Sequence, residues 1–142
     1  MKRIATLLVL TLLSSMYSCK NSTNFDPTVL VQTSLNNMQT GRYAFPDTKT
    51  LILVKDDYSA HLRSLYYGKN KLILKAVPKQ MLKYSHTPGD DTTKMYITTH
   101  YERLKRDYVF VSIELNHNRT FRFYFRSHEN MWKIESSFVD IH

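Results

Sequence analysis

The last third of the chain alternates apolar and polar residues in three successive runs, and this pattern constrains the fold more than any other feature. Strands that bury one face of a sheet have this two-residue period. The polar segments NHNR at 116–119 and SHEN at 127–130 separate the runs and predict turns. The apolar positions are Val109, Val111, Ile113 and Leu115, then Phe121, Phe123 and Phe125, then Trp132, Ile134 and Phe138. The sequence therefore predicts an antiparallel meander.

The same alternation suggests a register. In that register Arg122 lies opposite Glu114 on one neighbouring strand and opposite Glu135 on the other. Cross-strand ion pairs contribute about 0.2–1 kcal/mol each. Arg122 is therefore predicted to be structural rather than part of an anion site. The pairings assumed are Leu115 with Phe121 and Phe125 with Trp132.

A helix is predicted to begin at residues 26–27. Asp26 can cap the free N–H groups of a first turn, and Pro27 suits the first helical position. Apolar residues follow at helical spacing, and Gly41 is a plausible end. These apolar residues are Val31, Leu35 and Met38.

A second helix is predicted within residues 48–67, after a break at Phe45-Pro46-Asp47. The run LILV at 51–54 could instead form a short strand. Both a helix and a strand are therefore compatible with this segment. The residues at helical spacing are Leu51, Val54, Tyr58, Leu62 and Leu65, and they end before Gly68.

The middle of the chain gives shorter signals. KLILKAV at 71–77 predicts a strand, and Pro78 begins a short helix or turn. HTPGDDTT at 86–93 predicts a loop, in which Asp90 and Asp91 are turn residues. MYITTHY at 95–101 is rich in strand-forming residues, although YERLKRDY at 101–108 could continue it as a helix.

Helices followed by a meander predict an α+β fold, with N-terminal helices packed on a curved antiparallel sheet that ends in the β-meander. The closing sequence RFYFRSHENMWKIESSFVDI resembles the final hairpin of nuclear transport factor 2-like domains, and cystatin-like folds share this pattern. The resemblance implies a sheet that wraps a helix and often leaves a pocket. The nuclear transport factor 2-like family includes a few enzymes and many noncatalytic binding or assembly domains, so the fold alone assigns no function.

The start of the chain predicts export. MKRIATLLVLTLLSSMYSC has two cations and then an apolar run of signal-peptide length, which is too short to span a bilayer. With Cys19, the only cysteine, it resembles a bacterial lipoprotein signal of the relaxed form found among the Bacteroidetes. The resemblance implies cleavage between Ser18 and Cys19 and a diacylglycerol on the cysteine sulfur. Tyr17 departs from the pattern, because a small residue is usual there.

Other interpretations of the cysteine are an ordinary secreted or membrane-tethered protein and an intermolecular disulfide. The lipoprotein resemblance divides the chain into a signal peptide (1–18), a lipidated tether (19–25) and a single α+β domain (26–142). Lys20 follows the cysteine, where the family's inner-membrane retention signal has aspartate. We therefore expect a lipid anchor in the outer membrane, with the domain facing the periplasm.

Composition and motifs point away from several function classes. The chain of 142 residues has a formal net charge of +8, but its cations are spread out rather than forming the stripe of a nucleic-acid binder. No HExxH, His/Cys spacing, glycine-rich phosphate loop or GxSxG occurs. The best acid/base pair is His100 with Glu102, which share a strand face if this segment is extended. We predict no catalytic residue, no metal and no cofactor.

The expected function is a membrane-anchored, noncatalytic domain that binds a small molecule or an envelope protein. A subunit of an envelope complex and an immunity-type lipoprotein that blocks a toxin both fit this description. The alternative is a small enzyme with a pocket on a nuclear transport factor 2-like fold. That enzyme would need Asp or His residues facing into a deep cavity, whereas apolar side chains filling the space would oppose it. A nucleic-acid partner is not expected for an exported protein.

Overall fold

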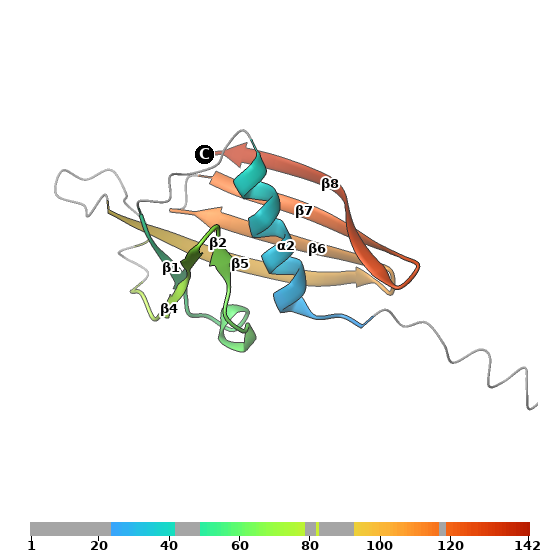
Figure 1. Ribbon diagram of the computed structural model, residues 1–142, viewed down its shortest axis with the longest axis horizontal. Helices are drawn as coiled ribbons and strands as arrows, with labels where there is room; N and C mark the ends of the chain where they lie inside the picture. The colour runs from blue at the N-terminus through green and yellow to red at the C-terminus, as the bar shows by residue number, and fades with distance from the viewer. Residues whose placement is uncertain (1–23, 42–48, 79–81, 83–92, 117–118) are drawn as a thin grey trace, which may run out of the picture.

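The computed structural model describes residues 24–41, 49–78, 82, 93–116 and 119–142. Six strands form one mixed sheet in the order β4-β1-β5-β6-β7-β8, and β2 and β3 form a separate hairpin. Helix α2 lies across one face of the sheet (Figure 1). The elements are α2 (Pro27–Thr40), β1 (Thr50–Val54), the 3₁₀ turn η1 (Ser59–His61), β2 (Tyr66–Tyr67), β3 (Asn70–Lys71), β4 (Ile73–Lys75), β5 (Lys94–Lys105), β6 (Tyr108–Leu115), β7 (Arg119–His128) and β8 (Met131–Ile141).

The predicted fold class is wrong. Most described residues lie in strands, α2 is the one long helix among them, and the sheet is mixed rather than antiparallel. Strand β1 pairs in parallel with both β4 and β5, while β5 to β8 are antiparallel. The predicted N-terminal helices on a curved antiparallel sheet, and the nuclear transport factor 2-like or cystatin-like architecture that the closing sequence suggested, are therefore replaced by one helix on a mixed sheet.

The cause of this error lies in residues 48–67. The run LILV forms β1, and all four of its side chains are buried. A strand with parallel neighbours on both sides and cover on both faces has a continuous apolar run instead of alternation. The remaining positions at helical spacing fall in loops and in η1, so their spacing did not reflect a helix.

Helix α2 is confirmed in its start, its buried face and its end. The Asp26 carboxylate accepts a hydrogen bond from the Thr28 amide at 3.0 Å, and Pro27 takes the first helical position. At the other end the Gly41 amide donates to the Met38 carbonyl at 3.2 Å. The buried residues are Leu30, Val31, Ser34, Leu35 and Met38.

The middle of the chain is confirmed in part. The segment 71–77 contributes β4 and the end of β3, as two short strands separated by Leu72. The segment 94–105 is a single long strand, so ERLK continues β5 and does not form a helix. The break at 45–47 lies outside the described residues, as does the predicted loop 86–93 apart from Thr93.

The antiparallel meander is confirmed, as are the predicted buried faces of β6 and β7. The odd-numbered side chains of β6 and the phenylalanines of β7 are buried against α2. Strand β7 ends at His128 and β8 begins at Met131, so only Glu129 and Asn130 form the turn, with φ of 50° and 62°. Positive φ at both positions is typical of a two-residue hairpin loop of the type that matches strand twist.

The predicted register is wrong by two residues at both hairpins. Leu115 pairs with Arg119, and Phe125 pairs with Ile134. A shift of two keeps each side chain on its predicted face, because strand side chains alternate with a period of two. It changes the residues that lie opposite Arg122, however. They are Ser112 and Phe138 rather than Glu114 and Glu135. Arg122 forms an ion pair with Asp140, with 2.9 Å between Nη1 and Oδ2.

An irregularity in β8 also changes one predicted core position. The register with β7 shifts between Tyr124 and Phe125, where β8 contains an extra residue. Trp132 and Ile134 pack on the core, whereas Phe138 lies on the opposite face and is 56% exposed. The bulge moves the alternation by one position, so the prediction that all three residues share one face is wrong for Phe138.

The described chain starts in contact with the sheet. The Trp132 indole Nε1 donates to the Asn24 carbonyl at 3.1 Å, and the Phe25 ring lies 6.2 Å from that of Tyr101, measured between centroids. Asn24 and Phe25, the last two residues of the predicted tether, are therefore held by the domain. Figure 1 shows this segment running from α2 toward the ends of the β5–β6 and β7–β8 hairpins.

Candidate binding surface

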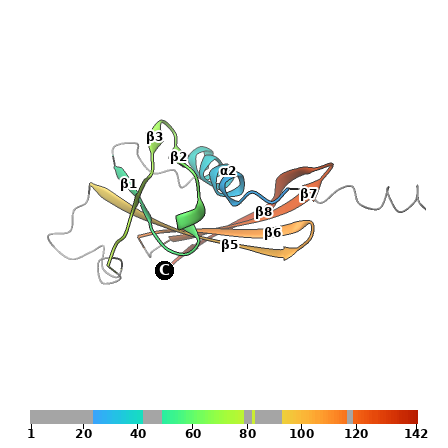
Figure 2. The ribbon, with the colours of Figure 1, turned by 90° about the horizontal axis from the view of Figure 1, so that it is seen from below.

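The two sides of the sheet differ in their cover. Helix α2 and the β2–β3 hairpin lie on one side, and no described helix covers the other side of β6, β7 and β8 (Figure 2). We call this second side the outer face. Its side chains come from the strand positions that alternate with the buried positions described above.

Aromatic rings form a continuous series across the outer face. The Phe110 ring lies 5.2 Å from Tyr124 and 6.1 Å from His100, centroid to centroid. Tyr124 lies 6.0 Å from Phe138 and 5.9 Å from Tyr108. Separations of this size are those of interacting aromatic pairs. We call these five residues the outer aromatic row. It reaches from β5 to β8.

The row is half-buried by contact between its own members. His100, Tyr108, Phe110 and Tyr124 are intermediate in exposure, and Phe138 at the β8 end is mostly exposed. Beyond β5, Tyr58 extends the row, because its ring lies 4.3 Å from that of His100 in an edge-on arrangement. The result is a surface of large side chains that are already ordered before any partner binds.

Ion pairs flank the row along β7. The Arg126 guanidinium donates to both oxygens of Glu135, at 2.7 and 3.3 Å, and to Asp107 at 3.1 Å. The same guanidinium lies over the Tyr108 ring, 4.7 Å from its centroid. The hydrogen bond to Glu135 is the main cause that raises the pKa of Arg126 above its usual value. These contacts fix the orientation of the arginine at the edge of the row.

Sequence reasoning identified only one part of this surface in advance. His100 and Glu102 lie on the same face of β5, as predicted, but the contacts described for His100 are aromatic, with Tyr58 and Phe110. Arg126 was missed. In YVF at 108–110 and FYFR at 123–126, however, the residues that alternate with the core positions are aromatic or basic. These alternate residues were the sequence signal that could have predicted the surface.

Ser18 and Cys19, the expected cleavage and lipidation residues, lie outside the described residues. Within the described ranges, no group of three or more His, Cys, Asp or Glu side chains could hold a metal ion. No described helix has the length and apolar character required to cross a bilayer.

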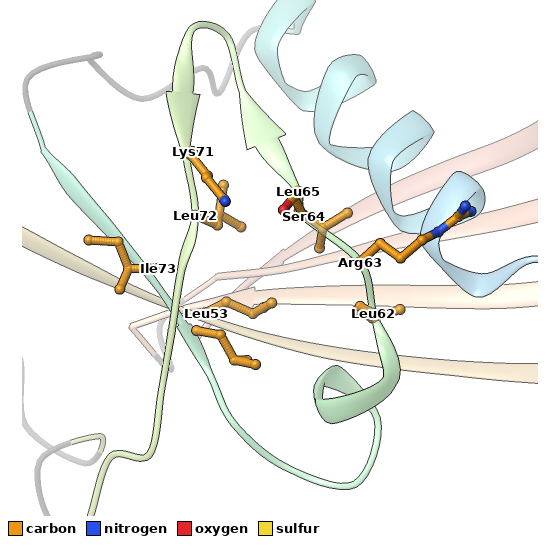
Figure 3. Close-up of a pocket in the computed structure, with 9 residues that line it drawn as sticks. Leu53, Leu62, Arg63, Ser64, Leu65, Lys71, Leu72 and Ile73 are labelled. Atoms are coloured by element: carbon orange, nitrogen blue, oxygen red, sulfur yellow. The ribbon is translucent and has the colours of Figure 1, made fainter.

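A second candidate is a groove beside the edge strand β4 (Figure 3). It has a volume of about 470 Å³. Ile73 and Leu74 are 53% and 43% exposed there, while Leu53, Leu65 and Leu72 line it from buried positions. The Arg63 side chain points out of the groove toward the start of α2 and forms an ion pair with Asp26. The remaining lining residues are Leu62, Ser64 and Lys71.

A hydrogen-bonded clamp joins this part of the chain to the helix. The Gln32 side chain donates to the Tyr66 carbonyl at 2.8 Å and accepts from the Tyr66 amide at 2.9 Å. The Arg63 amide also donates to the Thr28 hydroxyl at 3.2 Å. These contacts hold the β2 side of the groove against α2.

Comparison with known proteins gives no relative. The chain matches no family model, no curated protein and no solved structure.

Proposed function

We propose that the protein is a noncatalytic binding domain whose binding surface is the outer aromatic row, held close to a membrane by its N-terminus. The observation that carries the proposal is the row itself. Five ring-bearing side chains lie in contact across four strands, on the side of the sheet that no described helix covers. An apolar patch of this kind on a soluble domain is typical of an interaction site.

A protein is the partner that best fits this surface. Protein interfaces have an aromatic centre and a polar rim, with Tyr, Phe and Arg enriched. The outer face has both parts, because Arg122–Asp140 and Arg126–Glu135 lie beside the row. Phe138 supplies the most exposed ring and is the best candidate for an anchor residue. An envelope-complex subunit and an immunity-type lipoprotein both remain within this proposal.

The packing between helix and sheet opposes the alternative of a pocket enzyme. The buried residues of α2 meet β6 and β7 with apolar side chains, among them Leu35, Val111 and Phe123. Only Ser34, Ser59 and Thr99 are buried polar residues in the described part of the chain. The described residues therefore bring no inward-facing acid and base, which such an enzyme requires, into this space.

The proposed location rests on the sequence. Cys19, after a leader of signal-peptide length, is the proposed acyl attachment site, and the proposed compartment is the periplasmic side of the outer membrane. Two or three acyl chains anchor a protein stably, whereas one gives marginal binding. Membrane fractionation of the wild type and Cys19→Ala tests the anchor. We expect the alanine variant to lose acylation and lipoprotein-type processing and therefore to be absent from the outer-membrane fraction, and unchanged processing with unchanged outer-membrane retention would contradict the anchor.

The binding surface is tested separately by one substitution and a matched control. Phe138→Asp places a charge in the most exposed part of the row, and Val29→Asp does the same at a residue of α2 that is 52% exposed. We expect Phe138→Asp to reduce recovery of a co-purifying envelope protein at least tenfold and Val29→Asp to leave it unchanged. Equal recovery with both variants would exclude the row as the binding surface.

A small apolar ligand in the β4 groove is a second candidate. The aliphatic lining and the volume of about 470 Å³ favour it, since ligand sites are concave and mostly apolar. An uncharged apolar dye such as Nile red provides the probe. Leu72→Asp should abolish enhancement of its fluorescence, while Phe138→Asp should preserve it. The absence of any enhancement with the wild type would remove this candidate.

A further inference from the structure

The end of the sheet formed by two hairpin turns holds the first described residues of the chain. We call residues 103–107 and 128–133 the hairpin end. One turn connects β5 to β6 and the other connects β7 to β8. Trp132 in the second turn region donates to the Asn24 carbonyl at 3.1 Å. The Arg103 guanidinium in the first lies over the Phe25 ring, 5.8 Å from its centroid. Both hairpins therefore fix the path of the chain toward its N-terminus.

This position limits how far the hairpin end can be from an anchor at Cys19. Five residue steps separate Cys19 from Asn24. An extended chain covers at most about 3.6 Å per residue, so the two Cα atoms are at most about 18 Å apart. The opposite end of the sheet, where β8 finishes at Ile141, lies a full strand length further away (Figure 1).

The hairpin end has side chains suited to a lipid surface. Leu104 and Met131 are 44% and 53% exposed. Arg103, Lys105, Arg106 and Lys133 provide four cations there, against the two acids Asp107 and Glu129. Asp107 forms an ion pair with Arg126, so Glu129 is the one acid of the hairpin end that opposes these four cations. Exposed apolar residues surrounded by cations are the composition of a surface that binds anionic membranes.

We infer that the hairpin end faces the membrane and contacts anionic lipid headgroups, with Leu104 and Met131 entering the interfacial region. This inference rests on the proposed lipid anchor and adds an orientation to it. The outer aromatic row lies on a face of the sheet, next to this end. When the hairpin end faces the membrane, that face stands upright on the membrane surface, and a partner reaches the row from the side. The orientation therefore leaves the row accessible while the domain is anchored.

The test uses the full, processed protein with one introduced cysteine carrying the dye NBD. The proposed diacylglyceryl group blocks the thiol of Cys19, so Leu104→Cys, Met131→Cys and the control Ile141→Cys each offer one thiol for labelling. The vesicles contain phosphatidylethanolamine and phosphatidylglycerol in a ratio of about three to one, with and without lipids that carry a quencher. We expect a severalfold rise in NBD emission, and quenching by lipid, at positions 104 and 131 but not at 141.

Charge reversal at the hairpin end tests the electrostatic part. Lys105→Glu with Arg106→Glu should lower the lipid-embedded fraction of the label at position 131 by about tenfold. Lys69→Glu with Lys71→Glu on the β2–β3 hairpin is the matched control and should leave it unchanged. The same effect from both pairs would contradict a specific contact at the hairpin end.

The outcomes separate the orientation from the anchor. If the protein floats with the vesicles while labels at 104 and 131 stay as exposed to water as the label at 141, the orientation is overturned and the anchor stands. If the processed protein does not float and Cys19 titrates as a free thiol, both the anchor and the orientation are overturned.

Discussion

Thr99 places a hydroxyl on the buried face of β5, where it has no hydrogen-bond partner among the described residues. The side chain is 1% exposed and lies opposite Ile113 of β6. Thr99→Val keeps the β-branched shape and removes the unpaired polar group. Because an unpaired buried hydroxyl costs free energy, we expect the unfolding free energy to rise by about 1 kcal/mol. Urea denaturation measures it, and a loss of stability would show that the hydroxyl is paired.

The Tyr101 phenol makes the stability of the folded state depend on pH in the alkaline range. Its hydroxyl donates to the Tyr58 carbonyl at 3.1 Å. Burial is the main cause that raises the pKa of this phenol above its ordinary value of 10.0, and the charge of Asp56 and the neighbouring Tyr58 add to it. The folded state therefore favours the neutral phenol. Its contribution to stability is complete below pH 10.0 and is lost as the pH rises through the higher pKa of the folded state.

We expect Tyr101→Phe to change both the level and the pH dependence of stability. The lost hydrogen bond should cost about 0.5–1.5 kcal/mol at pH 7. Above pH 10 the stability of the wild type should fall more steeply than that of the variant, so that their difference shrinks. Chemical denaturation between pH 7 and 11.5 measures the two curves. Curves that remain parallel over this range would contradict the role assigned to the phenol.

For Arg122 the sequence predicted the correct face of the sheet but the wrong partner. The alternation placed Arg122 on the face opposite the core, and the structure agrees. Its partner was predicted wrongly, because alternation defines the face of a side chain but not its position along the neighbouring strand. The turns set that position, and each moved the pairing by two residues. Glu135 consequently binds Arg126, a pair that the predicted register did not contain.

At the scale of elements, α2 was predictable and β1 was not. The start and the end of α2 depend on local chemistry, an Asp-Pro cap and a glycine, that any sequence reading can recognise. The identity of β1 depends on its neighbours β4 and β5, which cover a run of four apolar residues that is equally compatible with a helix. The bulge in β8 was similarly hidden, since it depends on pairing with β7.

The clamp between α2 and β2 gives a prediction at this scale. Gln32 makes two hydrogen bonds to the backbone of Tyr66. We expect Gln32→Ala to lower the unfolding free energy by about 1–3 kcal/mol, because two backbone groups lose their partner. Hydrogen exchange should show a larger increase at the Tyr66 amide than in β6. Gln39→Ala, at an exposed position on the same helix, is the control, and equal effects of the two variants would contradict the clamp.

At the scale of the whole molecule, the sheet separates packing from binding. One side carries α2 and the apolar core, and the other carries the outer aromatic row (Figure 2). The hairpin end lies at one end of the strands, between these two sides, and holds Asn24. The candidate site was therefore largely hidden in the sequence. Its aromatic residues come from four strands, and their adjacency depends on a register that the turns and the bulge determine.

Photo-crosslinking in intact cells tests the binding role of the outer aromatic row most directly. A photoreactive phenylalanine replaces Tyr124 or Phe138 in the row, and Val29 on α2 in the control. The account predicts an adduct of one defined mass from positions 124 and 138, no adduct from position 29, and loss of the adduct from position 124 when Phe138→Asp is added. Adducts of equal yield from all three positions, or an adduct only from position 29, would contradict it, as would an adduct that contains only a second copy of this chain.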